Sequence, residues 1–107
     1  MPATFKSLTA ERSPDPKKIG VLGYADYYHG DGGTSNEIKI ADDLPDYDFA
    51  KVIRHELGHC FGLGHNEEKY TIMYSNEWYS AEHMTCVDLQ AFCDVWGCDA
   101  MKMDLCK

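Results

Sequence analysis

The sequence lacks long apolar runs, and positive charge is scarce in it. No stretch reaches the roughly 18 consecutive apolar residues that a membrane-spanning helix needs. Ten lysines and arginines stand against 18 aspartates and glutamates, which gives a formal net charge of −8, and such a surface would repel nucleic-acid phosphates. We therefore expect neither a membrane nor a nucleic acid as a partner.

A secretory signal, internal repeats and low-complexity tracts are also missing. We expect either that the protein stays inside the cell that makes it, or that a targeting segment has been removed from a mature domain. The chain has 107 residues, of which 44% are hydrophobic. That length predicts one domain with a modest core.

The most informative stretch is HELGHCFGLGH, which runs from His55 to His65. His55 and His59 are four positions apart, so a helix places them on the same face. Two neutral imidazoles held in this way suit a zinc ion. Glu56, one position round from His55, can reach a water bound to that metal and take its proton. The pattern therefore predicts the site of a zinc hydrolase.

The third histidine, His65, comes too late in the chain to lie on the next turn of the same helix. The helix must therefore end and the chain turn back toward the metal. We expect Gly62 to end the helix in the left-handed conformation, and Gly64 to keep the returning backbone slim. Three histidines leave the fourth zinc position for water, which is typical of a catalytic zinc rather than a structural one.

At these residues the chain resembles the metzincins and, within them, the matrixin family. HELGHCFGLGH fits the long metzincin zinc motif, and TIMY, Thr71 to Tyr74, resembles the Met-turn of matrixins. The resemblance implies that Met73 forms an apolar floor beneath the three imidazoles without binding zinc. The resemblance extends to the final helix, at residues 84–97. It extends more weakly to two strands, at residues 21–28 and 37–43.

We expect an α+β fold in which a small mixed sheet of about three strands packs on the active-site helix. The expected strands are 3–9, 20–28 and 37–40, with a loop at 11–18. One helix is expected at 47–61. A second helix should begin with a capping box formed by Thr85 and Asp88 and end at Gly97. Residues 1–107 should form a single catalytic domain. Its parts are a strand and loop part (1–46), the zinc-binding helix and turn (47–65), and the Met-turn with the C-terminal helix (66–107).

Several positions depart from the matrixin pattern. The family's second, structural zinc has no plausible ligands here, since Tyr24 and Lys39 occupy the matching positions. Calcium is possible but not favoured, with His29, Asp31 and Asp43 as candidate ligands. Only 54 residues precede His55, so the resemblance implies an N-terminally shortened or minimal form. Self-association or a partner domain could then cover the far side of the sheet.

The resemblance also implies where a peptide substrate binds. In the family, the strand that matches Gly20 to Tyr28 lies at the sheet edge above the zinc and pairs with the substrate main chain. This makes Val21, Leu22 and Gly23 candidate contacts. Trp78 and Tyr79 should line the pocket for the residue after the scissile bond, which we expect to be hydrophobic. Ser75 and Glu77 replace a proline and a tyrosine that are typical of that wall.

Five cysteines leave one over after pairing. Cys86 and Cys93 lie on one helix and are too far apart to bond to each other, so each should pair with Cys98 or Cys106. We expect Cys93 with Cys98, Cys86 with Cys106, and a buried free thiol at Cys60. Such disulfides favour an extracellular or otherwise oxidising compartment.

The function that these patterns predict is a zinc-dependent endopeptidase. His55, His59 and His65 would bind one catalytic zinc, and Glu56 would be the general base for hydrolysis of a peptide or protein substrate. Two alternatives stay open. One is a catalytically weak zinc-binding module that binds peptides or a partner, and the other is a zinc hydrolase that acts on other bonds.

Overall fold

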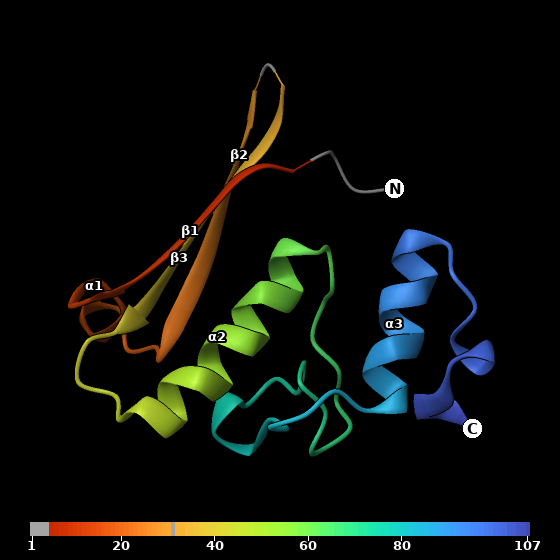
Figure 1. The fold of residues 1–107 in the computed structure, drawn as a ribbon. Coiled ribbons are helices and arrows are strands. Elements are labelled where there is room, and N and C mark those ends of the chain that lie inside the picture. Colours follow the sequence, from red (N-terminus) through yellow and green to blue (C-terminus); the bar gives the residue numbers. More distant parts are fainter. Residues whose placement is uncertain (1–4, 31) are drawn as a thin grey trace.

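A three-stranded sheet, a long helix across it and a second helix region follow one another through the molecule (Figure 1). The structure is a computed structural model and describes residues 5–30 and 32–107. The strands are β1 (Phe5–Ser13), β2 (Gly23–Gly30) and β3 (Gly33–Ala41), in the spatial order β1-β3-β2. β1 runs parallel to β3, and β2 antiparallel to it. The predicted α+β fold with a small mixed sheet is confirmed.

The central strand β3 alternates between buried and partly buried side chains because one face of the sheet packs on a helix. Ile38 and Ile40 are fully buried in this face. Sequence reasoning found only residues 37–40 of this strand, because the polar residues before them hide its period. Of the predicted strand 3–9, Ala3 and Thr4 lie outside the described residues, and the rest belongs to β1.

The predicted loop at 11–18 is wrong over most of its length. β1 continues to Ser13, because pairing with β3 extends to Ser13 opposite Ala41. A short helix follows, α1 (Asp15–Lys18), with Pro14 as its cap and Pro16 in its first turn. The first turn of a helix has no use for the N–H that proline lacks, so the two prolines begin a helix here rather than prevent one.

The helix α2 (Asp46–Cys60) packs on the inner face of the sheet and agrees with the predicted helix at 47–61 to within a residue. Its Val52 joins Ile38 and Ile40 in the main hydrophobic cluster. At the start of β2 the strand approaches this helix so closely that a Cβ on Gly23 would lie 2.8 Å from Val52 Cγ1. Glycine is therefore required where β2 crosses the helix.

The second helix region is small and covalently closed. The helix α3 (Cys86–Trp96) begins with the predicted capping box of Thr85 and Asp88 and ends at Gly97 in the left-handed conformation, with φ +82°. Two short helices, η2 (Ala100–Lys102) and η3 (Asp104–Cys106), complete the chain. Both predicted disulfides are confirmed, Cys86–Cys106 and Cys93–Cys98, and Cys60 is a buried free thiol.

The outer part of the sheet has no cover among the described residues. Helices α2 and α3 lie on one side of the sheet (Figure 1), and residues 7–12 of β1 are all exposed, including Leu8 at 42%. None of the helices in the described part of the chain is both long and apolar enough to span a membrane.

Candidate metal centre

Three imidazole rings meet at one end of α2. His55 and His59 come from consecutive turns of the helix, and His65 comes from the segment that follows it. The ring centroids lie 4.9 Å apart for His55 and His59, 5.3 Å for His55 and His65, and 4.9 Å for His59 and His65. One ring nitrogen of each lies within 4.8 Å of the others. The predicted ligand set is therefore brought together in space.

The end of α2 makes this convergence possible. Gly62 has φ +89°, its N–H donates to the His59 carbonyl at 2.9 Å, and the Leu63 N–H donates to the Gly58 carbonyl at 3.0 Å. This is the helix-ending geometry that a left-handed glycine allows. The surroundings of Gly64 do not require a glycine, because a Cβ at that position would meet nothing within 4 Å. The expected need for a slim backbone there is therefore not found.

Hydrogen bonds to backbone carbonyls fix two of the rings. His55 Nδ1 donates to the Ile72 carbonyl and His59 Nδ1 to the Leu63 carbonyl, each at 2.8 Å. A carbonyl only accepts, so Nδ1 carries the hydrogen in each ring, and Nε2 keeps its lone pair. His55 Nε2 is buried and has no hydrogen-bond partner among the described residues. An orphaned lone pair of this kind fits a metal ion, and such carbonyl partners are common behind metal-binding histidines.

Burial keeps these imidazoles neutral, as metal binding requires. Burial, with the neighbouring His59 and His65 as smaller causes, lowers the pKa of His55 to about 4. The pKa of His59 is also lowered, again mainly by burial. Protons therefore compete poorly for these two nitrogens at neutral pH.

Glu56 lies beside this cluster with one carboxylate oxygen free to act. The residue is 3% exposed, and its buried Oε2 has no hydrogen-bond partner among the described residues. Burial raises the pKa of Glu56 to about 7. A carboxylate with a pKa near neutrality can both accept and return a proton, which suits a general base.

The loop beneath the site is held by an acid that sequence reasoning treated only as a helix cap. The buried Asp88 carboxylate accepts from the Ile72 N–H at 2.9 Å and from the Met73 N–H at 3.4 Å, besides its bonds to Thr85. The Ile72 carbonyl in turn holds His55. A hydrogen-bond path thus runs from α3 through Ile72 to a candidate metal ligand.

Met73 lies against the face of α2 between the two helical histidines. It is 1% exposed, and its Sδ contacts Gly58 so closely that a Cβ at that position would overlap it. A flexible thioether can fill such an irregular space. Its role as the floor of the metal site stays a prediction.

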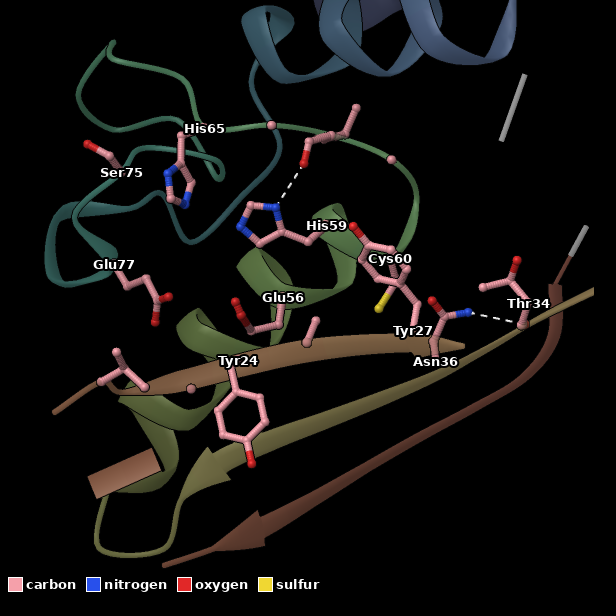
Figure 2. Close-up of a pocket in the computed structure, with 16 residues that line it drawn as sticks. Tyr24, Tyr27, Thr34, Asn36, Glu56, His59, Cys60, His65, Ser75 and Glu77 are labelled. Atoms are coloured by element: carbon pink, nitrogen blue, oxygen red, sulfur yellow. Dashed lines mark hydrogen bonds between the residues drawn. The ribbon is translucent and has the colours of Figure 1, made fainter. Parts of the chain in front are cut away.

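A cleft of about 820 Å³ opens over the site between β2 and the segment after α2 (Figure 2). Val21 and Gly23, two of the three candidate substrate contacts, line it, whereas Leu22 packs against the hydrophobic core. Trp78 and Tyr79 line a second cleft, of about 430 Å³, which includes none of the three histidines. Neither aromatic residue lines the cleft that contains His59 and His65, and their role as a wall of the substrate pocket stays a prediction.

Glu77, from the same turn, points into the metal site instead. Figure 2 shows its carboxylate facing Glu56 across the cleft, and its Oε1 lies 3.8 Å from His55 Nε2. Burial, with Glu56 as a second cause, raises the pKa of Glu77 to about 8. Sequence reasoning noted that Glu77 replaces a tyrosine of the family but missed its position. The sequence feature that could have indicated this position is an acidic residue only four residues after Met73.

The residues considered for other metals have protein partners. Lys39, at a position where the family has a zinc ligand, forms ion pairs with Asp15 at 3.1 Å and Glu37 at 3.4 Å, and Tyr24 lies opposite it on β2. Asp43, a calcium candidate, lies 3.8 Å from Lys17 Nζ. Asp31 and the side chain of His29 lie outside the described part. The absence of a structural zinc stays a prediction.

Comparison with known proteins agrees with the motifs. The model of the matrixin family matches residues 18–97, a range that contains α2, the three histidines and α3. Searches of curated proteins and of solved structures found no significant match. Because the family match covers most of the chain, the protein belongs to the matrixins, a family of zinc metallopeptidases.

Proposed function

We propose that the protein is a zinc-dependent endopeptidase whose catalytic unit is a single domain formed by residues 1–107. Family membership supports a zinc metallopeptidase. The observation that carries the proposal is the pair of imidazoles held by backbone carbonyls, with the buried Nε2 of His55 left unpartnered beside Glu56. This arrangement fits zinc held by His55, His59 and His65, above Met73 as an apolar floor.

A zinc ion bound there would polarise the scissile carbonyl and make a water molecule acidic at neutral pH. Glu56 accepts the proton of the attacking water, because one of its carboxylate oxygens lies within 4.8 Å of a ring nitrogen of His55 and its Oε2 has no hydrogen-bond partner among the described residues. The same carboxyl then returns the proton to the leaving amine. Its raised pKa, about 7, supports both steps, since a much stronger acid would hold a proton too poorly to deliver it.

The edge strand β2 supports binding of an extended peptide. It pairs with β3 on one side and borders the cleft with Gly23, as does Val21 just before the strand. Its other side therefore offers main-chain groups to a substrate strand. We propose these two residues as substrate contacts. Trp78 and Tyr79 are proposed as contacts only for substrate residues that reach the second cleft.

The test compares the zinc-loaded protein with its Glu56→Gln variant on denatured casein and a quenched peptide library, with a chelator control. We expect the variant to retain zinc and to lose about 10²- to 10⁴-fold in activity. Glu68→Gln, on an exposed side chain that lines neither cleft, is the matched control and should cut normally. A Gln variant that has also lost its zinc would make Glu56 structural.

The same assay separates the alternatives. The uncovered face of β1 is the observation that favours an interaction module, for which we expect stoichiometric zinc without turnover. Cleavage of small esters but not of peptides would instead indicate a hydrolase acting on other bonds.

A further inference from the structure

We propose that Glu77 is a fourth protein ligand of the metal in the substrate-free protein. Its carboxylate would then occupy the position that a substrate carbonyl or the attacking water needs, and would have to leave before catalysis. The inference rests on the zinc site of the proposed function but not on peptidase activity.

The distance between donor atoms supports shared coordination. Glu77 Oε1 lies 3.8 Å from His55 Nε2. Two ligand atoms at the usual zinc distances and a tetrahedral angle are about 3.4 Å apart. Ligand atoms of His55, Glu56 and Glu77 all lie within 4.8 Å of one another, so this set and the three-histidine set share His55.

The chemistry of the two facing atoms also indicates a cation. His55 Nε2 has only a lone pair to offer, because Nδ1 carries the hydrogen that the Ile72 carbonyl accepts. Glu77 presents carboxylate oxygens, of which Oε2 is buried and without a hydrogen-bond partner among the described residues. Two acceptors that face each other are unfavourable unless a proton or a metal cation lies between them, and at 3.8 Å these two atoms are too far apart to share a proton in a hydrogen bond.

Hydrogen bonds fix the backbone around Glu77, so the fold itself places its carboxylate near His55. Glu77 begins the short helix η1 (Glu77–Tyr79), and its carbonyl accepts from Ser80 Oγ at 2.8 Å. Lys51 of α2 donates to the Trp78 carbonyl at 2.6 Å. The side chain itself is 16% exposed. Release of the carboxylate therefore needs a rotation of the Glu77 side chain rather than movement of η1.

Two consequences follow for metal and inhibitor binding. Removing the Glu77 carboxylate should weaken zinc binding, because one of four protein ligands is lost. It should also make the open coordination position easier to reach for acetohydroxamate, a small metal-binding compound. The two affinities thus change in opposite directions, which a general loss of folding would not produce.

The test uses Glu77→Gln, which preserves shape, with Glu82→Gln as the control at an exposed acid. Zinc affinity is measured by competition with a chelator, and acetohydroxamate binding is followed by the visible spectrum of the Co²⁺-loaded protein. We expect Glu77→Gln to weaken zinc binding by about tenfold or more, to change the Co²⁺ spectrum and to bind acetohydroxamate more tightly than the wild type.

Equal zinc affinity and an unchanged spectrum in Glu77→Gln would overturn the inference. So would a spectrum that changes in Glu56→Gln and not in Glu77→Gln, because Glu56 would then be the carboxylate ligand. Neither result depends on turnover. An inactive protein that still shows the expected metal and acetohydroxamate differences would refute the peptidase proposal and leave Glu77 as a ligand.

Discussion

The sheet with α2 and the region around α3 are stabilised by different means. In the first, Ile38, Ile40 and Val52 are at most 2% exposed and form a continuous apolar cluster with their neighbours. In the second, only Leu89, Cys93 and Ala100 form the buried cluster, and two disulfides close the chain around them. A region with little apolar area to bury relies on covalent links.

The candidate metal centre draws on both regions. His55, Glu56 and His59 belong to α2. The loop beneath them is held by hydrogen bonds from the Ile72 and Met73 N–H groups to Asp88 of α3. A second contact joins the regions where Trp96 Nε1 donates to the Phe61 carbonyl at 2.9 Å. The metal ligands of α2 thus depend on apolar packing, whereas the loop that supports them depends on hydrogen bonds to α3.

The largest effect should come from Asp88→Ala. The change leaves the buried N–H groups of Ile72 and Met73 without an acceptor and removes a helix cap, at a cost of about 3 to 5 kcal/mol in the free energy of unfolding. Zinc affinity should fall as well, since Ile72 orients His55. Urea unfolding and chelator competition measure both. Asp94→Ala, at an exposed acid of the same helix, is the control and should change neither, and an Asp88 variant with normal zinc affinity would disprove the proposed support.

A smaller loss should follow from opening the C-terminal region with the double variant Cys86→Ser/Cys106→Ser. The disulfide closes a loop with a sequence separation of 20 residues, and cross-links of this size contribute about 3 kcal/mol. Because the ligands depend on the other region, zinc affinity in the folded protein should stay within about twofold of the wild type. Hydrogen exchange should increase in α3 and the residues after it while α2 keeps its protection. Equal loss of protection in both would show that the two regions unfold as one.

Gly58→Ala should destabilise the metal-site region by about 1 to 3 kcal/mol through overpacking. Its new Cβ would overlap Met73 Sδ and push the methionine away from α2. Gly64→Ala is the matched control, because a Cβ at that position meets nothing within 4 Å. Urea unfolding of the two variants compares them directly. Equal stabilities would mean that the contact of Met73 with α2 carries little energy.

The parts of this protein that the sequence predicts well are those governed by local rules. Helix α2 has apolar residues at helical spacing and ends two residues before the left-handed Gly62. The capping box before α3 and the Gly97 that follows it are local signals too. The three histidines converge because one helix and one turn position them all. Each of these features depends on residues close together in the chain.

The features that the sequence does not predict depend on distant partners. The strand β1 continues past residue 10 because β3 pairs with it, and nothing in residues 11–13 themselves announces a strand. Asp88 looks like a helix cap and also serves a loop 15 or 16 residues earlier. Glu77 and Trp78 are adjacent, yet they line different clefts. Which side of a turn each faces is decided by packing, so no local pattern reveals it.

The smallest effect should come from Trp96→Phe, which tests the second contact between the two regions. The variant keeps an aromatic ring next to Phe92, on which Trp96 stacks with a centroid distance of 6.0 Å, but loses the Nε1–H that donates to the Phe61 carbonyl. One such hydrogen bond contributes about 0.5 to 1.5 kcal/mol to the free energy of unfolding. Trp78→Phe, at a side chain that is 50% exposed, should change it by less than about 0.5 kcal/mol. Urea unfolding measures both variants, and chelator competition should find zinc affinity unchanged in each. If Trp96→Phe weakened zinc binding as much as Asp88→Ala, the support of the metal site would extend along the whole of α3 rather than depend on its first turn.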